Sequence, residues 1–148
     1  MAYTQILLHI VFSVKNREPM INKDWRDRLY KYMIAIIQKN KHKVLAFGGT
    51  DDHVHILIGF HQTQTLTSLM LELKRDSSKW INENKFLNRK FAWQSSYGAF
   101  SCSKSQLNQV VQYIHNQEEH HKERTFYDEF KLLLDKYEVE YDEKYLHE

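Results

Sequence analysis

The pattern of apolar residues marks strands in the first part of the chain. Over residues 3–14, the alternate positions from Ile6 to Val14 are entirely apolar, and the other set is mixed and includes Gln5 and His9. Residues 53–60 repeat this pattern. Because successive side chains of a strand point to opposite faces, each segment is predicted to be a strand that buries one face. The short apolar segment 43–48 and the turn residues after it predict a hairpin into the strand at 53–60.

Apolar residues recur at helical spacing in four other segments. Residues 23–41 follow a candidate N-cap, Asn22, and residues 66–83 carry apolar side chains three and four positions apart. A capping box that starts at Ser103 opens a third predicted helix. A short fourth helix is predicted after Thr125, followed by an acidic and aromatic tail.

The order of these elements predicts an α+β fold. A fourth strand is expected over 91–101, with Gly98 as a bulge. Strand, helix, strand, strand, helix, strand is typical of a ferredoxin-like or RNA-recognition-motif-like antiparallel sheet with helices on one face, here with C-terminal helices added. The mixed face of the two central strands is then expected to be open. It carries Gln5, His9, His53 and His55.

Composition places the chain among globular proteins. Its 148 residues, 42% hydrophobic and 14% aromatic, fit one domain with a substantial core. The net charge of +2 neither requires nor excludes a nucleic-acid partner. The single cysteine excludes an internal disulfide. Since no secretory signal and no apolar run of ~18 residues is visible, we expect a cytoplasmic protein.

Two histidines are the first candidates for chemistry. His53 and His55 stand two residues apart at the head of a predicted central strand, so both point to one face. With nine histidines in the chain, such a pair is expected by chance roughly 0.5 times. Spacing alone leaves two interpretations, ordinary surface histidines or two ligands of a metal ion. The shared face favours the metal ion.

Tyr113 and Gln117 add a second pair in the third predicted helix. They lie four residues apart and share a helix face. That face is turned ~70–110° from the centre of the apolar stripe, so Tyr113 is not simply a core residue. The alternative for Gln117 is a solvated surface position.

Three blocks of the sequence, taken together, carry a family resemblance. They read DDHVHILI at 51–58, WQSSYGAF at 93–100 and YIHNQEEHH at 113–121. In this order they resemble the single-tyrosine HUH transposases of small bacterial insertion sequences, relatives of the REP-associated tyrosine transposases. Many members have Pro-Asp where this chain has Asp51-Asp52, a difference that concerns the turn and not the ligands. The resemblance extends over about 3–146.

The resemblance implies a role for each candidate residue. His53 and His55 are expected to be metal ligands, with Gln117 as the third ligand through its side-chain oxygen. A divalent ion, Mg²⁺ or Mn²⁺, accepts such ligands and leaves positions for a phosphate. Tyr113 is expected to be the nucleophile. Its attack would give a covalent 5′-phosphotyrosine and a free 3′-hydroxyl, so the DNA can be rejoined without ATP.

The family also implies a substrate and an assembly. The expected substrate is single-stranded DNA with hairpin ends at an insertion sequence. The expected assembly is a homodimer in which the tyrosine helix of one subunit completes the histidine site of the other. One transposase domain is expected over 1–148, with the catalytic sheet at about 3–101 and the nucleophile and C-terminal helices at about 103–148.

Two other functions fit parts of the pattern. A non-catalytic module of the RNA-recognition type would bind single-stranded nucleic acid on the same sheet face. Such modules stack bases on aromatic residues of the central strands, where this chain has histidines and a glutamine. A domesticated relative that cuts repeats without mobilising an element would share the transposase chemistry.

Other residues compete for roles in the site. For each of them, packing or a plain surface position is the competing interpretation. His115, His120 and His121 could form a second metal site, and Tyr97 is an alternative nucleophile. The set is His9, Tyr97, Cys102, His115, His120 and His121. Candidate phosphate contacts are Lys15, Arg17, Lys41, Lys43, Lys74, Arg75, Lys79, Arg89 and Lys90. Candidate stacking residues are Trp93, Tyr97 and Phe100.

Overall fold

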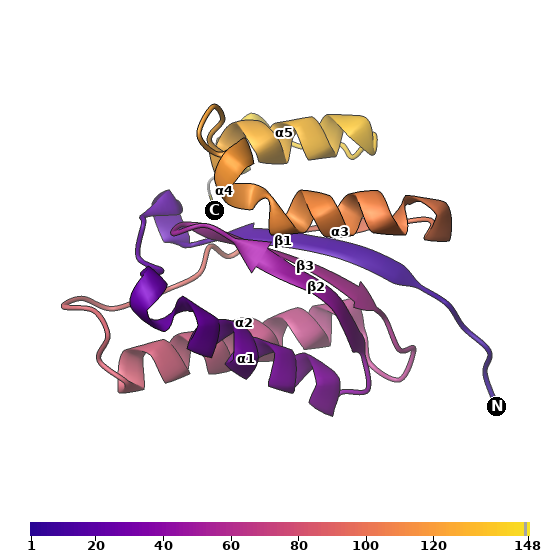
Figure 1. Ribbon diagram of the computed structural model, residues 1–148, viewed down its shortest axis with the longest axis horizontal. Coiled ribbons are helices and arrows are strands. Elements are labelled where there is room, and N and C mark those ends of the chain that lie inside the picture. Colours follow the sequence, from indigo (N-terminus) through magenta and orange to yellow (C-terminus); the bar gives the residue numbers. More distant parts are fainter. Residues whose placement is uncertain (147) are drawn as a thin grey trace.

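A four-stranded antiparallel sheet lies between two layers of helices in the computed structural model, which describes residues 1–146 and 148 (Figure 1). The strand order is β2-β3-β1-β4. The strands are β1 (Leu7–Ser13), β2 (Lys43–Gly49), β3 (His53–Gly59) and β4 (Gly98–Ser101). The helices are α1 (Lys23–Lys39), α2 (Leu66–Glu83), α3 (Leu107–His115), α4 (Gln117–His120) and α5 (Phe126–Lys136). Short 3₁₀ turns are η1 (Lys15–Arg17), η2 (Lys104–Gln106) and η3 (Glu143–Tyr145).

The main core lies between the sheet and helices α1 and α2. Ile10 and Phe12 of β1 and Val54 and Ile56 of β3 are fully buried there. The helices contribute Leu29, Met33, Leu69 and Leu73 to the same cluster. These contacts confirm the predicted apolar faces of the two central strands and the predicted α+β fold.

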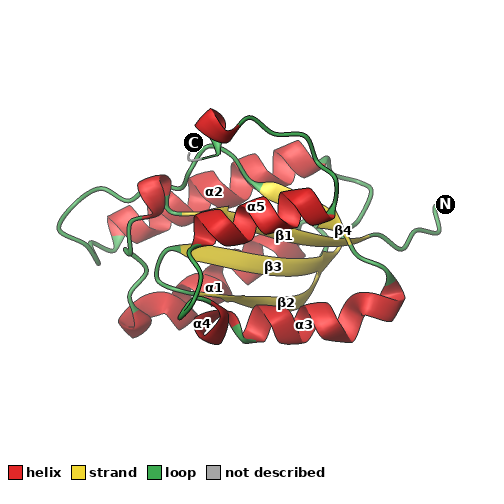
Figure 2. Cartoon of the chain, turned by 90° about the horizontal axis from the view of Figure 1, so that it is seen from above, coloured by secondary structure: helices red, strands yellow, loops and turns green. Residues whose placement is uncertain are grey.

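The face of the sheet that was predicted to be open is covered, which corrects that expectation. His9, His53 and His55 are only 3%, 0% and 0% exposed. Helix α3 lies along β2 and β3, while α5 runs above β1 (Figure 2). These helices pack against the sheet through two apolar clusters. The first joins Ala46, Leu57, Cys102 and Ile114, and the second joins Val11, Phe100, Phe126, Phe130, Leu134 and Leu146.

Two glycines allow these helices to approach the sheet closely. A Cβ atom at Gly48 of β2 would lie 2.4 Å from the carbonyl oxygen of Ile114, and one at Gly98 of β4 would lie 2.7 Å from the Phe130 ring. Carbon atoms do not approach to these distances without displacing their neighbours. Gly98 is thus a point of close helix contact and not the predicted bulge, since the β1–β4 register runs without a shift there.

Several element boundaries differ from the prediction. β1 begins only at Leu7, so Gln5 precedes the strand and is exposed. The predicted strand at 91–101 is regular only from Gly98, and the residues before it are joined to the end of β1 by an isolated bridge between Val14 and Trp93 and by two hydrogen bonds of Gln94. The Gln94 side chain accepts a 2.8 Å hydrogen bond from the Ser13 backbone N–H, and the Gln94 N–H donates to the Ser13 carbonyl at 2.9 Å.

The first two helices match the prediction closely, and the third does not. α2 has the predicted bounds, and α1 ends at Lys39 instead of Lys41. The helix expected to carry both Tyr113 and Gln117 is divided, since α3 ends at His115 and Gln117 opens α4. The kink at Asn116 nevertheless leaves Gln117 buried against the sheet.

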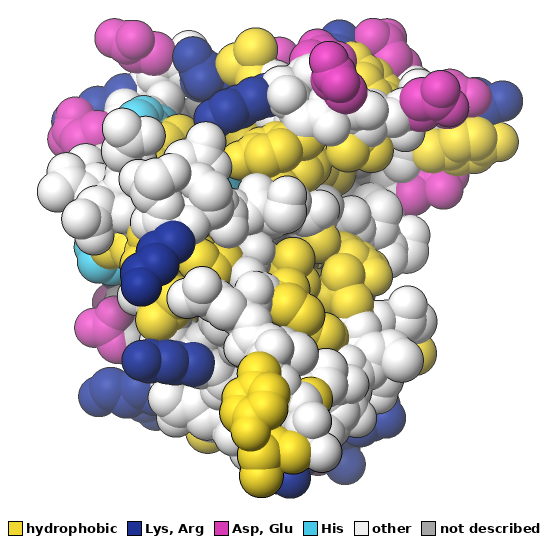
Figure 3. All heavy atoms as spheres, turned by 90° about the vertical axis from the view of Figure 1, so that its right-hand side faces the viewer, with side chains coloured by type: hydrophobic (Ala, Val, Ile, Leu, Met, Phe, Trp, Pro, Cys, Tyr) yellow, Lys and Arg dark blue, Asp and Glu magenta, His cyan; other side chains and the backbone are white. Residues whose placement is uncertain are grey.

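Charge is unevenly spread over the surface. On the face in Figure 3, most acidic side chains gather at the top, over the C-terminal layer, and lysines and arginines are scattered among uncharged and apolar surface below. This distribution agrees with a net charge of only +2. Any cationic site for a polyanion must therefore be local.

Candidate active site

Two histidines of β3 form the base of the site. His53 and His55 alternate with Val54, so both rings project away from the main core, with centroids 5.1 Å apart. Each ring is held through its Nδ1 atom. Nδ1 of His53 is 2.7 Å from Asp52 Oδ1, and Nδ1 of His55 is 2.8 Å from His9 Nε2. Both Nε2 atoms are therefore left for the centre of the site.

The contact with Asp52 sets the tautomer of His53. Burial opposes ionisation of Asp52, but hydrogen bonds from His53 and Thr50 hold the pKa of its carboxyl below the ordinary value. An ionised carboxylate can only accept, so His53 donates through Nδ1. In the neutral ring Nε2 then carries a lone pair.

Gln117 points an acceptor at that lone pair. Its side-chain NH₂ donates a 3.2 Å hydrogen bond to the Tyr113 carbonyl, and this contact orients the amide. The Gln117 oxygen consequently lies 2.9 Å from His53 Nε2. Two acceptors at this separation require a proton or a cation between them. The arrangement fits a metal site.

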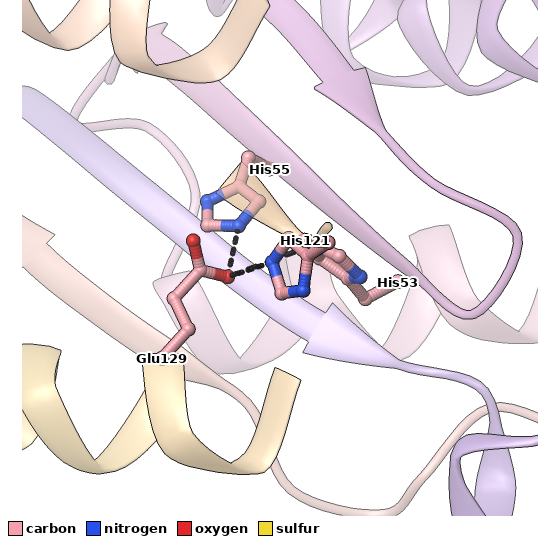
Figure 4. Close-up of side chains that lie close together, drawn as sticks. All are labelled: His53, His55, His121 and Glu129. Atoms are coloured by element: carbon pink, nitrogen blue, oxygen red, sulfur yellow. Dashed lines mark hydrogen bonds and ion pairs between the residues drawn. The ribbon is translucent and has the colours of Figure 1, made fainter. Parts of the chain in front are cut away.

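Glu129 and His121 complete a buried cluster around the same point (Figure 4). The Glu129 Oε1 atom is 2.8 Å from His55 Nε2, 3.0 Å from His121 Nε2 and 3.6 Å from His53 Nε2. The ligand atoms of these four residues all lie within 4.8 Å of one another, so the cluster could hold a metal ion.

Sequence reasoning missed Glu129 and considered His121 only for a second metal site or a surface position, whereas the structure places it in the same cluster as His53 and His55. The signal for Glu129 was present, because it stands three residues after Phe126 and four before Leu133, inside the apolar stripe of α5. A carboxylate there is unexpected unless it has polar partners. His121 offered no such signal, since its position depends on the turn between α4 and α5.

Tyr113 meets the cluster within the same chain. Its hydroxyl donates a short hydrogen bond to Oε2 of Glu129, and its ring lies edge-on to that of His55, with centroids 5.7 Å apart. The ring also stacks on His120 at 4.6 Å. The four residues predicted from the sequence, His53, His55, Tyr113 and Gln117, are thus brought together.

A family model supports the resemblance independently. The model described as "Transposase IS200 like" matches residues 2–117, which is most of the chain. The chain belongs to the IS200-like transposase family. His121 and Glu129 lie beyond the matched residues.

Solved structures share the fold of this transposase. A protein from Deinococcus radiodurans R1 assigned as a transposase is 22% identical, with a TM-score of 0.64 over 78% of this chain and 93% of that one. A REP-associated tyrosine transposase, solved bound to a REP hairpin, is 14% identical, with a TM-score of 0.59 over 77% of this chain and 67% of that one. Among curated proteins, none matches the chain significantly.

The electrostatics of the candidate site favour the neutral imidazoles of His9 and His55 beside one ionised carboxylate, that of Glu129. Burial lowers the pKa of His55 to about 4, although Glu129 opposes the shift. Burial and the neighbouring His55 lower the pKa of His9 to about 3. Burial disfavours the charged form of Glu129, yet hydrogen bonds from His121 and His55 hold its pKa well below the ordinary value. Neutral imidazole is the form that binds metals.

Tyr113 is held in its protonated form in this arrangement. Burial raises the pKa of its phenol, and the negative charge of Glu129 raises it further. A neutral phenol is a weak nucleophile, so a nearby cation would be needed to favour the phenolate.

A cleft of about 720 Å³ adjoins the cluster on the side of Asp52 and His121. Arginines and lysines contributed by η1, α1 and the α4–α5 turn line it together with several carboxylates. The basic members are Arg17, Lys23, Arg26, Lys122 and Arg124. Of these, only Arg17 was among the phosphate contacts expected from the sequence.

Most of the competing candidates have structural roles. Trp93 and Phe100 are buried core rings, so they cannot stack on bases. Tyr97 packs against the main core with Lys74 over its ring. Cys102 is buried beneath α3, where burial raises the pKa of its thiol.

The cations proposed for DNA contacts are partly engaged elsewhere. Lys74 donates to the carbonyls of Gln94 and Ser96 at 2.9 and 2.7 Å, and burial lowers its pKa to about 8. Arg75 pairs with Asp76, and Arg89 with Glu18. Within residues 1–146 and 148, no helix has the length and apolar character needed to cross a membrane.

Proposed function

We propose that this transposase cuts and rejoins single-stranded DNA at insertion-sequence ends through a covalent bond to Tyr113. The observation that carries the proposal is the convergence of the Tyr113 hydroxyl, two Nε2 atoms and the Gln117 oxygen on one buried cluster. The family assignment supports transposase activity but does not by itself identify the nucleophile.

The residues that would hold the ion are His53 and His55 through Nε2 and Gln117 through Oε1. The unshared lone pairs of His53 and Gln117, 2.9 Å apart, fit a cation between them. Mg²⁺ or Mn²⁺ suits this donor set because both accept nitrogen and oxygen ligands. A bound divalent ion would neutralise charge on the scissile phosphate and favour the phenolate.

The protein residues then account for the covalent steps. The Tyr113 oxygen forms a bond to phosphorus while the bond from phosphorus to the 3′-oxygen breaks. The 3′-oxygen leaves with a proton as a 3′-hydroxyl, and the phenol proton is lost from Tyr113. In the reverse step, another 3′-hydroxyl attacks the 5′-phosphotyrosine and restores both the diester and the phenol. No energy from ATP is needed because one ester replaces another.

The proposed substrate is single-stranded DNA with hairpin ends. This proposal draws on the related transposase solved with a REP hairpin, and on the cleft beside Asp52 and His121. Basic side chains in that cleft, including Arg17 and Arg124, would contact the phosphates. The competing binding module without catalysis gains no support, because His9, His53 and His55 are buried on the face where it would stack bases.

The proposed unit is one transposase domain over 1–148, assembled as a homodimer. Tyr113 already lies beside the cluster in a single chain. An exchange of the tyrosine helix between subunits would therefore require α3 to give up its close contact with Gly48 of β2. The exchanged arrangement stays a prediction.

Strand nicking tests the proposal. A labelled single-stranded hairpin substrate should be nicked in the presence of Mg²⁺ or Mn²⁺ and left intact after chelation. His53→Ala should abolish nicking, and His42→Ala, a matched change at a buried histidine outside the cluster, should retain it. Nicking that is indifferent to chelator would contradict the metal assignment.

A further inference from the structure

Glu129 is the least explained residue of the cluster. It stands on the apolar face of α5, is 1% exposed and lies outside the residues matched by the family model. Its Oε1 atom is surrounded by three imidazole Nε2 atoms at 2.8, 3.0 and 3.6 Å. A buried carboxylate is costly unless its partners are fixed in place.

Packing alone does not account for this carboxylate. An apolar residue at this position would extend the cluster formed by Phe126, Phe130 and Leu134. Glu129 instead turns its two oxygens to different polar groups, with Oε2 on the Tyr113 hydroxyl and Oε1 on the imidazoles. One atom is therefore directed at the same point as the predicted metal ligands.

The spacing of the donor atoms suits a single ion. A metal bound at ~2.1 Å in octahedral geometry holds adjacent ligand atoms ~3.0 Å apart. Three of the observed separations are 2.8, 2.9 and 3.0 Å, for His55–Glu129, His53–Gln117 and His121–Glu129 respectively. These distances belong to five side chains from β3, α4, the α4–α5 turn and α5.

We infer that Glu129 and His121 are additional ligands of the metal ion, supplied by the C-terminal segment beyond the family-matched residues. The inference rests on the metal site of the proposed function, and it is independent of strand cleavage. Five protein donors would leave one octahedral position open. The C-terminal segment would then tighten metal binding in the DNA-free protein, and the remaining position would be available to the scissile phosphate.

Direct metal binding without DNA tests the inference. Calorimetric titration with Mn²⁺ should give a dissociation constant at least tenfold weaker for Glu129→Gln than for the unmodified protein. Asp135→Asn is the matched control, because it removes the same charge from an exposed position of the same helix, outside the cleft beside Asp52 and His121. Its dissociation constant should change less than twofold.

A second variant guards against misfolding of Glu129→Gln. His121 retains 11% exposure of its side chain, so His121→Asn disturbs the core less, and it should also weaken Mn²⁺ binding. Its neighbour His120→Asn should not. The visible absorption of bound Co²⁺ should change its intensity and position in both ligand variants, as expected when the ligand set changes.

The outcomes separate this inference from the proposed function. Loss of Mn²⁺ affinity in His53→Ala but not in Glu129→Gln and His121→Asn would overturn the inference and leave the metal site of the proposed function intact. Unchanged affinity in all three variants would overturn both. Weakened affinity in all three, with DNA nicking lost in His53→Ala and in Tyr113→Phe, would support both.

Discussion

Nε2 of His9 lies 2.8 Å from Nδ1 of His55, and this hydrogen bond can run in either direction. Without a metal ion, His55 donates through Nε2 to Glu129, so its Nδ1 must accept from His9. With an ion on Nε2, Nδ1 carries the proton and donates to His9. A neutral His9 can serve both states by changing its tautomer, which makes it a positioning residue for a metal ligand.

Replacement of His9 should therefore weaken metal binding. We expect His9→Leu to raise the Mn²⁺ dissociation constant ~10–100-fold, as is usual when the partner of a metal-bound histidine is removed. Titration calorimetry without DNA measures the effect. His42→Leu is the control, since His42 is also 3% exposed but bonds to Gln64 away from the cluster. Equal losses in both variants would show a general effect on folding.

The stability of the metal-free protein should fall as the pH is lowered from 7 to 5. The pKa of His9 is about 3 and that of His55 about 4 in the folded chain, whereas an unfolded histidine has a pKa near 6.5. Between these values the unfolded chain binds more protons, so the free energy of unfolding decreases with decreasing pH. Each histidine contributes a loss of about 1–2 kcal/mol at pH 5.

Urea unfolding at pH 7 and pH 5, with a chelator present, measures this loss. His9→Gln should show a smaller difference in the free energy of unfolding between the two pH values than the unmodified protein. The reason is that one of the two histidines with a lowered pKa is absent. A difference of the same size in the variant would contradict the assignment to His9.

The close contact at Gly48 gives a prediction about α3. Gly48→Ala places a Cβ atom 2.4 Å from the Ile114 carbonyl oxygen, so α3 must shift away from β2. We expect a loss of about 1–3 kcal/mol in the free energy of unfolding, typical of overpacking, together with reduced nicking, because α3 carries Tyr113. Gly59→Ala is the matched control, since its nearest contact would be an ordinary 3.6 Å. Similar stability of the two variants would contradict the packing argument.

Local periodicity predicted the parts of this fold that depend on one face of one element. The apolar stripe of α2 gave its bounds, Leu66–Glu83, and alternation gave the buried faces of β1 and β3. Periodicity did not predict that α3 and α5 would cover the second face. That outcome depends on pairwise packing, such as the Phe130 ring against Gly98, between residues far apart in the sequence.

In the candidate site, too, local sequence features predicted some residues, and long-range packing determined the others. Spacing and family blocks were enough to single out His53, His55, Tyr113 and Gln117. Glu129 reaches His55 from 74 positions away in the sequence, and its role depends on how α5 is seated. Its place within an apolar stripe was the one local sign that it has a polar partner.

The covalent intermediate tests the central claim most directly. The protein should be incubated with a single-stranded hairpin substrate and Mn²⁺, digested, and analysed by mass spectrometry for a nucleotide-bearing peptide. We predict a 5′-phosphotyrosine on Tyr113, no adduct in Tyr113→Phe with hairpin binding preserved, and an undiminished adduct in the control Tyr97→Phe. An adduct that persists in Tyr113→Phe, or that maps to Tyr97, would contradict the account.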